Sequence, residues 1–470
     1  MRRDIVPLLT LAIGFIMAMI DVTEVNVALP DIARSLTVPL SGLVWVVDAY
    51  TLMFAALLFA RGALADRFGA RIAYVAGLVV FILGSVLCGA ARTEQALIAA
   101  RLIQGASAAM FMPSSLSLIT IQYEDSRTRA RMIGIWAAMV GLGATMGPLV
   151  GGVLTHMFGW RSVFWVNIPV GILGLYLIQQ DGPKTHGRKI PLALKGHLLS
   201  VIGLGSLSFV LIEGPTRGWS APPILMAGMA AVVSVLAIIR LERRGAHPIV
   251  PREILGTQGF GVLNIIGFLN NFATFGSLFL FSLYFQDGTA TTSLQAGSLL
   301  LPAMAAITTG NLLSNKISVR IGIRRTMLSG WLTAALESIA LILPINSVSR
   351  HCMAFILCVL NLAVGISVPA MTESMMQITG TKFSNSGAAA LNANRQISAL
   401  VGVAVVGTVL HAAHGWDVRI HTSCLFFFIA YAAPDSRYCA SLRRTVPLKL
   451  AAVFETTSLH LNDEYRAFHR

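Results

Sequence analysis

This 470-residue sequence has few charged residues, since only 12% of its residues are Asp, Glu, Lys or Arg. Soluble domains carry charge on about a quarter of their residues, so water is excluded as the main solvent. Hydrophobic residues make up 55% of the chain. Apolar segments of about 20 residues, the length of a membrane-spanning helix, recur from Val6 to His411 between short charged loops. The sequence predicts an all-α polytopic membrane protein.

Acidic residues are the scarcer charged type, with 21 Asp and Glu against 35 Lys and Arg, for a net charge of +14. In a soluble protein this excess would suggest nucleic acid, but here the basic residues gather in alternate loops. They are Arg2 and Arg3, then Arg61, Arg67 and Arg71, then Arg127, Arg129 and Arg131, then Lys184, Arg188, Lys189 and Lys195, then Arg240, Arg243 and Arg244, and finally Arg320, Arg324 and Arg325. Cytoplasmic loops hold the excess of Lys and Arg. We expect a multi-pass protein of the bacterial cytoplasmic (inner) membrane, with a cytoplasmic N-terminus and no nucleic-acid partner.

Cysteines are few and lack the paired spacing of a zinc or redox site, so we interpret them as small apolar residues. They are Cys88, Cys352, Cys358, Cys424 and Cys439. Histidines are scattered, and no phosphate loop or clustered acids on one loop are present. The pattern predicts no metal and no cofactor, and it argues against a membrane-embedded enzyme acting on a lipid-linked substrate, which stays the alternative from another class.

The apolar segments fall into three groups. The first six lie near 6–29, 43–60, 72–91, 96–119, 132–154 and 162–178. Two follow near 197–213 and 223–239, and five more near 260–285, 297–315, 326–343, 352–371 and 388–411. The first segment runs to Leu29 without a clear cleavage site, so we expect a retained helix.

A last candidate span, Ile420–Ala433, is short at about 14 residues, which gives 13 or 14 spans in total. We expect an N-terminal bundle in residues 1–181, a central helix pair in 182–245 and a C-terminal bundle in 246–420. Residues 421–470 would hold an atypical short span and a polar tail.

The first apolar segment contains two acids, Asp21 and Glu24, one turn apart on the same helix face. Ionisable residues inside the membrane are costly and usually functional. Burial favours the neutral form of a carboxyl group, so such acids can take up and release protons. The alternative is that either acid lies near the outer interface and only meets water.

The fourth segment embeds Arg101 in apolar sequence, followed one turn later by Gln104 and Gly105. A membrane arginine needs a partner or water, and a position close to Asp21 would link conformation to proton affinity. The alternative is that Arg101 snorkels to the surface as an anchor. Glu337, inside a later apolar run, is another intramembrane acid and could line a polar cavity.

The fifth segment reads GATMGPLVGG from Gly143. Gly143 and Gly147 form a small-xxx-small face, Pro148 removes a backbone donor, and Gly151 and Gly152 extend the smooth surface. Close helix packing and a kink are expected.

A faint internal repeat adds to these motifs, since GALADRFGAR from Gly62 is echoed by SVRIGIRR from Ser318. Carriers built from related halves show such repeats.

Taken in order, these motifs resemble the major facilitator superfamily, specifically its fourteen-helix drug:proton antiporter branch. The similar stretches are Asp21–Pro30, Trp45–Leu52, Gly62–Arg71, Arg101 with Gln104 and Gly105, Gly143–Gly152, and GWRSVFWVNIPVG from Gly159. The resemblance weakens in the later half, where Gly297, Pro302 and Ser386–Gly402 still look like the family.

The resemblance implies two six-helix bundles around a central helix pair, and it implies residue roles. Proton coupling would fall to Asp21, Glu24 and Arg101, and the cytoplasmic gating loop to Gly62, Asp66, Arg67, Gly69 and Arg71. The antiporter motif would be Gly143, Gly147, Pro148, Gly151 and Gly152, and candidates for the substrate cavity are Asn26, Asp48, Gln104 and Glu337.

Three departures from the family stand out. Glu24 occupies a generally apolar position, Val319 stands where the first gating loop has Asp66, and Ala193 replaces an acid usual before the seventh helix.

The predicted function is proton-coupled export of small, lipophilic or cationic compounds by alternating access, with the proton gradient as energy source. A facilitator or importer of a metabolite is the alternative within transport, since fold does not fix function. Expected partners are the substrate, protons and the lipid bilayer. Some relatives work with a periplasmic adaptor, but nothing in the sequence identifies an adaptor surface.

Overall fold

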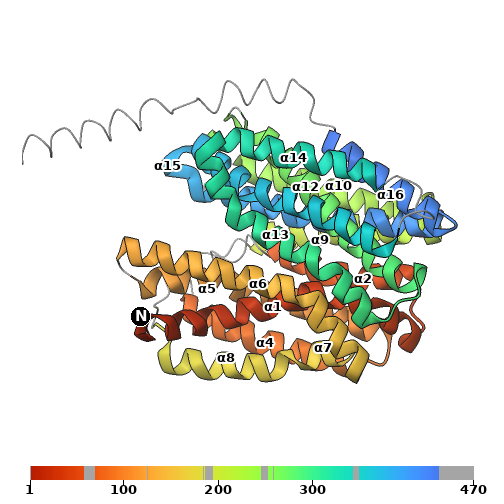
Figure 1. Ribbon diagram of the computed structural model, residues 1–470, viewed down its shortest axis with the longest axis horizontal. Coiled ribbons are helices and arrows are strands. Elements are labelled where there is room, and N and C mark those ends of the chain that lie inside the picture. Colours follow the sequence, from red (N-terminus) through yellow and green to blue (C-terminus); the bar gives the residue numbers. More distant parts are fainter. Residues whose placement is uncertain are drawn as a thin grey trace, which may run out of the picture.

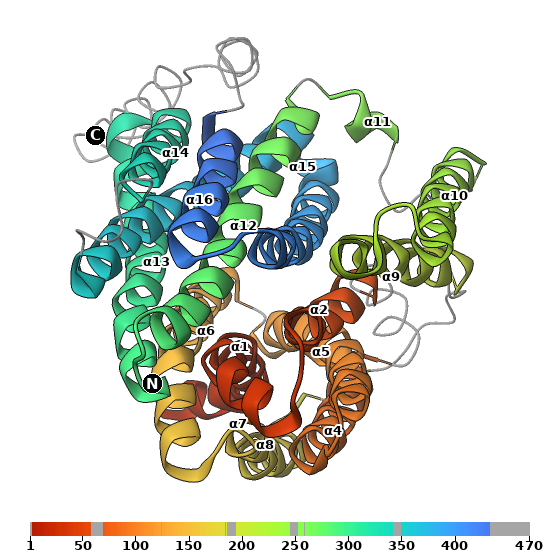
Figure 2. The ribbon, with the colours of Figure 1, turned by 90° about the vertical axis from the view of Figure 1, so that its right-hand side faces the viewer.

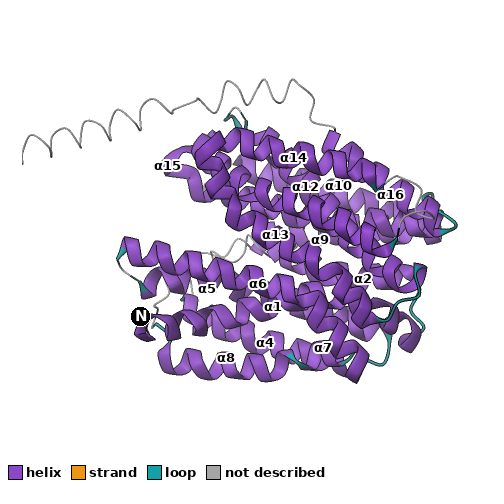
Figure 3. Cartoon of the chain, in the orientation of Figure 1, coloured by secondary structure: helices purple, strands orange, loops and turns teal. Residues whose placement is uncertain are grey.

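The computed structural model describes residues 2–57, 69–123, 125–183, 185, 194–244, 252–257, 259–341 and 349–432. Every regular element in these ranges is a helix, as Figure 3 shows. Twelve stretches within them are long and apolar enough to cross a membrane. The predicted all-α polytopic fold is confirmed.

The first six crossings form the N-terminal bundle, drawn from red to yellow in Figure 1. It consists of α1 (Arg2–Leu36), α2 (Leu40–Leu57), α4 (Ala70–Ala90), α5 (Glu94–Gln122), α6 (Ser126–Phe158), α7 (Ser162–Trp165) and α8 (Asn167–Asp181). The short α7 and the longer α8 make one crossing together. α1 runs seven residues beyond the predicted end at Leu29.

The central pair is α9 (Leu194–Arg217) and α10 (Pro222–Arg244). α9 packs against α2 and α15, whereas α10 packs mainly on α9 at the side of the molecule (Figure 2). Large apolar side chains of α10, such as Leu225, Met226 and Met229, are more than half exposed. An outward apolar face of this kind suits contact with lipid.

The C-terminal bundle follows a short helix, α11 (Arg252–Leu255). It comprises α12 (Phe260–Leu283), which continues as the π-helix η1 (Tyr284–Gly288), and then α13 (Ser293–Ile321), α14 (Ile323–Ala340), α15 (Arg350–Ala412) and α16 (Trp416–Ala432). α15 is two crossings, because Gly380 has φ 69° and ψ 170°, outside the helical region. α14 and α16 pack against other helices of this bundle but are not among the twelve apolar stretches, so the described residues show twelve candidate spans where 13 or 14 were predicted.

The two bundles meet mainly along three helix pairs, α1 with α12, α6 with α13, and α2 with α15, and α1 also contacts α13. Ser282 donates a hydrogen bond to the Asn26 carbonyl oxygen (2.6 Å), and Gln286 donates to the Val27 carbonyl oxygen (2.9 Å). These contacts lie in the later part of α1, away from the N-terminus (Figure 1). The bundles are therefore held together at the end of the molecule opposite the N-terminus.

Helices α13 and α15 cross at a pair of glycines. A Cβ atom on Gly310 would lie 2.5 Å from the Leu362 carbonyl oxygen, and one on Gly365 would collide with the Ile307 carbonyl oxygen. Backbone atoms cannot move away as a flexible side chain can. The two helices can therefore approach this closely only because each has a glycine where it meets the backbone of the other.

We expect Gly365→Val to destabilise the protein by about 1–3 kcal/mol, because overpacking forces backbone shifts. The measurement is the melting temperature of the purified protein in detergent. Gly261→Ala is the matched control, since a Cβ atom there meets nothing within 4 Å. Equal melting temperatures for both variants would contradict the close crossing.

Candidate functional site

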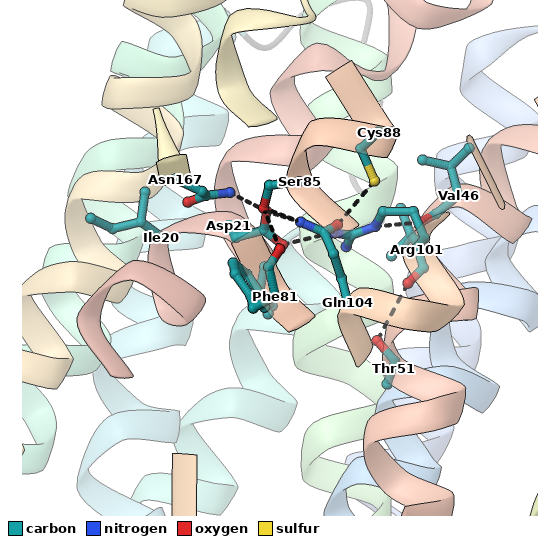
Figure 4. A network of polar contacts seen from close by, with 12 residues as sticks. Ile20, Asp21, Val46, Thr51, Phe81, Ser85, Cys88, Arg101, Gln104 and Asn167 are labelled. Atoms are coloured by element: carbon teal, nitrogen blue, oxygen red, sulfur yellow. Dashed lines mark hydrogen bonds and ion pairs between the residues drawn. The ribbon is translucent and has the colours of Figure 1, made fainter. Parts of the chain in front are cut away.

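A buried ion pair links α1 to α5 at membrane depth. Arg101 Nη1 lies 2.6 Å from Asp21 Oδ2, and the side chains are 2% and 0% exposed (Figure 4). Breaking such a pair leaves an uncompensated charge in a medium of low dielectric constant, which costs several kcal/mol. The two residues that the sequence predicted to interact are in direct contact.

The second oxygen of the Asp21 carboxylate is also occupied. Asn167 Nδ2, at the start of α8, donates to Asp21 Oδ1 over 2.9 Å, and Gln104 Nε2 approaches the same oxygen at 3.5 Å. An ionised carboxylate accepts hydrogen bonds at both oxygens and donates none. Asp21 is thus held as an anion by one cation and two amide groups from α5 and α8.

Gln104 connects this pair to α4. Its Oε1 accepts from Arg101 Nη1 (2.9 Å) and from the Cys88 thiol (3.2 Å), while its Nε2 donates to Ser85 Oγ (2.8 Å). Cys88 is buried, as expected of a small apolar residue, but its thiol also takes part in the polar network. Four helices of the N-terminal bundle therefore converge on one carboxylate, as Figure 4 shows.

The Arg101 guanidinium makes further contacts with α2. Its Nε donates to the Val46 carbonyl oxygen (3.1 Å), and its carbon lies 4.5 Å from the centre of the Tyr50 ring. A cation over an aromatic face is attracted by the ring quadrupole. The alternative that Arg101 snorkels to the surface is wrong, because the side chain is buried on every side.

Glu24 is buried in a different way. Its side chain is fully buried, and neither carboxyl oxygen has a hydrogen-bond partner among the described residues. Gly151 of α6 packs so closely that a Cβ atom there would lie 2.7 Å from Glu24 Cβ. The alternative of an interfacial, solvated Glu24 is wrong. Since a buried charge without donors is very unfavourable, Glu24 is neutral in this conformation.

A cavity of about 10 Å³, room for roughly one water molecule, lies beside Arg101. Its lining comes from both bundles: Val22, Val25, Asn26, Val47, Tyr50, Thr51, Arg101, Phe275, Ala399 and Val403. Binding pockets for drug-sized molecules are about 300–1,000 Å³, so the described conformation is closed around this point. Asn26 lines the cavity, whereas the other candidates Gln104 and Asp48 do not.

The glycines of the antiporter motif lie on two faces of α6. Gly143, Gly147 and Gly151 face α1, where added Cβ atoms would meet Ile16, Thr23 and Glu24. Gly152 faces α13 of the other bundle, since a Cβ atom there would lie 2.8 Å from the Ser293 carbonyl oxygen. Pro148 belongs to the same contact, because its carbonyl oxygen blocks any side chain at Gly297. The predicted close packing is present, and α6 is the helix between α1 and the C-terminal bundle.

The gating-loop residues Gly62, Asp66 and Arg67 lie outside the described residues. Gly69 precedes α4 with φ 91°, a conformation that favours glycine. Arg71 donates to the carbonyl oxygens of Ile178 and Gln179, at 3.1 and 3.2 Å. The described part of the loop thus connects α4 to the end of α8.

Glu337 belongs to α14, but its side chain also lies outside the description. Its predicted place in a cavity therefore stays a prediction.

Asn167, Ser85 and Tyr50 are the site residues that the sequence did not identify. Asn167 and Tyr50 lie within motifs that were recognised, but a motif does not say which side chain points at Asp21. An asparagine and a serine at membrane depth were the only available signal, since polar side chains there need partners.

Comparison with known proteins agrees with this geometry. The model of the Major Facilitator Superfamily matches residues 11–403, and the chain belongs to that family. The Methylenomycin A resistance protein of Bacillus subtilis is 43% identical over 426 residues, covering 90% of this chain and 91% of that protein. The protein of the same name from Streptomyces coelicolor is 41% identical over 433 residues, covering 92% and 91%.

Solved structures show the same fold. The peptide transporter POT in complex with sulfate superposes with a TM-score of 0.69 at 14% identity, covering 93% of this chain and 95% of the other. Membership of the superfamily confirms the predicted resemblance, and it makes the protein a multi-pass membrane transporter of small molecules and not an enzyme.

We expect Asn167→Leu to destabilise the protein by about 1–3 kcal/mol, because one oxygen of a buried carboxylate loses its shortest donor. The free energy of unfolding in detergent checks this. Asn264→Leu is the matched control, since its amide donates only locally, to the Phe260 carbonyl oxygen of the same helix. A Leu at position 167 that costs no more than the control would contradict a structural role for the bond to Asp21.

Proposed function

We propose that this protein exports small lipophilic or cationic compounds, antibiotics among them, across the bacterial cytoplasmic membrane in exchange for protons. The observation that carries the proposal is the buried Asp21–Arg101 pair, whose cation borders the cavity shared by both bundles. The similar proteins named for methylenomycin A resistance support export as the direction and an antibiotic as the substrate.

The sidedness follows from the basic loops, which assign the N-terminus and every second loop to the cytoplasm. With this orientation the end held by Ser282 and Gln286 lies on the outer side. The described conformation is then the one closed to the outside. In the opposite, outward-facing conformation, Asp66, Arg67 and Arg71 of the gating loop would stabilise the cytoplasmic end.

The proton step depends on Asp21. Protonation of its carboxylate removes the negative partner of Arg101, so the charge next to the cavity changes with the bound proton. A cationic substrate beside Arg101 is bound less well when the guanidinium is unpaired. Proton binding and substrate binding are therefore linked through one side chain. Glu24, close enough to interact electrostatically with both Asp21 and Arg101, is a further proton carrier.

Movement between conformations would take place along the glycine faces of α6. The two rocking units are residues 1–181 and residues 246–420, with α16 packed on the second unit. The central helices α9 and α10 lie at the side of the two units (Figure 2). The smooth contact of Gly152 with α13 lets one unit tilt on the other without unlocking large side chains. Export across one membrane is sufficient for this cycle, and the proposal requires no periplasmic adaptor.

The test is substrate-dependent proton flux in proteoliposomes under an imposed pH gradient, with methylenomycin A and puromycin as probes. We expect Asp21→Asn to reduce the flux to the level of empty liposomes, because the variant loses the carboxyl group whose protonation frees Arg101 from its ion pair. Asp31→Asn is the control on the same helix, since Asp31 forms an exposed ion pair with Arg34 and should transport normally.

Proton-driven transport that survives in Asp21→Asn would overturn the assignment of the coupling site. Substrate movement without any proton flux, in the unaltered protein, would favour the facilitator alternative.

A further inference from the structure

We propose that Asp48 is a second proton-binding site, at the junction of α2, α9 and α15, which holds its proton while this junction is closed and releases it when the junction opens. The inference rests on the alternating-access cycle proposed above. It assigns a role in that cycle to the central helix pair.

Asp48 is a fully buried carboxyl group without a partner. Its side chain has no exposed surface, and neither oxygen has a hydrogen-bond partner among the described residues. Asp21 in contrast has a cation and two amide donors. An ionised carboxylate in an apolar site without donors costs far more than its protonation, so Asp48 carries a proton in this conformation.

The register of α2 against α9 places Asp48 at their contact. Trp45 Nε1, one turn before Asp48, donates to Glu213 Oε1 of α9 (3.1 Å). Leu52, one turn after Asp48, lies 3.9 Å from where a Cβ atom on Gly205 would be. The two helices are thus antiparallel here, and Asp48 lies level with the turn of α9 that contains Ser208. Ser208 is also fully buried, and its hydroxyl group has no partner in the described structure.

The third helix at the junction around Asp48 is α15. Val44, one turn before Asp48 on α2, packs against Gly407. On the other side Thr408 of α15 donates to the Leu211 carbonyl oxygen of α9 (3.0 Å). A small cavity lies among these three helices, with Val44, Ile212 and Ala404 in its lining. Since α2 and α15 belong to different bundles, the junction must change when the bundles separate at this end.

Among the described residues, no ion pair or hydrogen bond balances a charge on Asp48. The helices packed against α2 are α1, α5, α9 and α15. Their described ionisable groups on the parts that adjoin α2 include Asp21, Glu24, Glu94, Arg101, Glu213, Arg395 and His411. Arg101 is engaged by Asp21, Gln104 and Val46, and Glu213 by Trp45 and Arg217. Burial alone acts on Asp48, so the entry of water is the event that allows it to ionise.

The position of α9 therefore controls a proton. With α9 docked, its buried face covers Asp48, and the hydrogen bond from Trp45 to Glu213 holds the two helices together. Release of the proton requires that α2 separate from α9 or from α15. Each closing of this end would then bind one proton in addition to the one exchanged at Asp21.

Infrared spectroscopy of the purified protein in lipid bilayers tests the protonation state directly, because a protonated carboxyl group has a C=O stretching band that an ionised one lacks. At neutral pH we expect Asp48→Asn to lose the intensity of one such group. Glu24→Gln should lose a separate component, and Asp31→Asn none, since Asp31 is partly exposed and paired with Arg34. If Asp48→Asn does not fold, Asp48→Glu keeps a carboxyl group and should move the band in frequency.

The role of α9 is tested by Trp45→Phe, which removes the donor to Glu213. We expect the Asp48 band of this variant to disappear at a lower pH than in the unaltered protein, because water reaches the carboxyl group more easily. Trp136→Phe is the matched control, since Trp136 Nε1 bonds to Ser115 within the N-terminal bundle (3.2 Å). It should leave the titration of the band unchanged.

An unchanged carboxyl band in Asp48→Asn would overturn the proposal, because Asp48 would then be ionised in the closed junction. A lost band whose titration Trp45→Phe does not move would overturn the control by α9. These measurements do not depend on transport. The proposal for Asp48 can therefore be overturned while Asp21-dependent export holds, and export can be overturned while the Asp48 proposal holds.

Discussion

The constraint on which the N-terminal bundle depends is that a charge at membrane depth must be paired. Asp21 and Arg101 form an ion pair. Asn167 donates a further hydrogen bond to Asp21, and Arg101 donates to Gln104 and to the Val46 carbonyl oxygen. In hydrocarbon none of these groups has water as an alternative partner. The pair therefore fixes how α1, α2, α5 and α8 are rotated about their axes, and α4 follows through Ser85.

The second constraint is steric. α6 lies between α1 and α13 at distances that exclude side chains, so its glycines determine how closely the two bundles can approach. Helices in lipid gain little from burying apolar surface against each other, and close backbone contact has to supply the attraction. A contact made of backbone and small side chains has no preferred interlocking, which suits two bundles that must change their relative tilt.

The sequence predicts the order of the apolar helices well, because apolar length determines what can cross a bilayer. Two of its predicted spans, near 326–343 and 420–433, are not among the twelve stretches found in the described residues. It also predicts the meeting of Asp21 with Arg101, since two opposite charges in hydrocarbon have few other partners. It does not reveal that Asn167 completes the site or that Glu24 has no partner. These facts depend on the rotation of each helix, which hydropathy does not encode. The two spans predicted near 352–371 and 388–411 are the two parts of α15 on either side of Gly380, whereas the start of α16 at Trp416 depends on packing and was not predicted.

The exposed apolar face of α10 has a consequence for the membrane around the protein. α10 reaches the rest of the molecule mainly through α9, and its outer apolar side chains are exposed. A helix so attached tilts when the bilayer becomes thinner or thicker, at a cost of a fraction of a kcal/mol per Å of mismatch. Because α9 also packs on α2 and α15, bilayer thickness acts on the balance between conformations. Lipid composition is thus a physical input to this transporter, separate from its substrate and its ions.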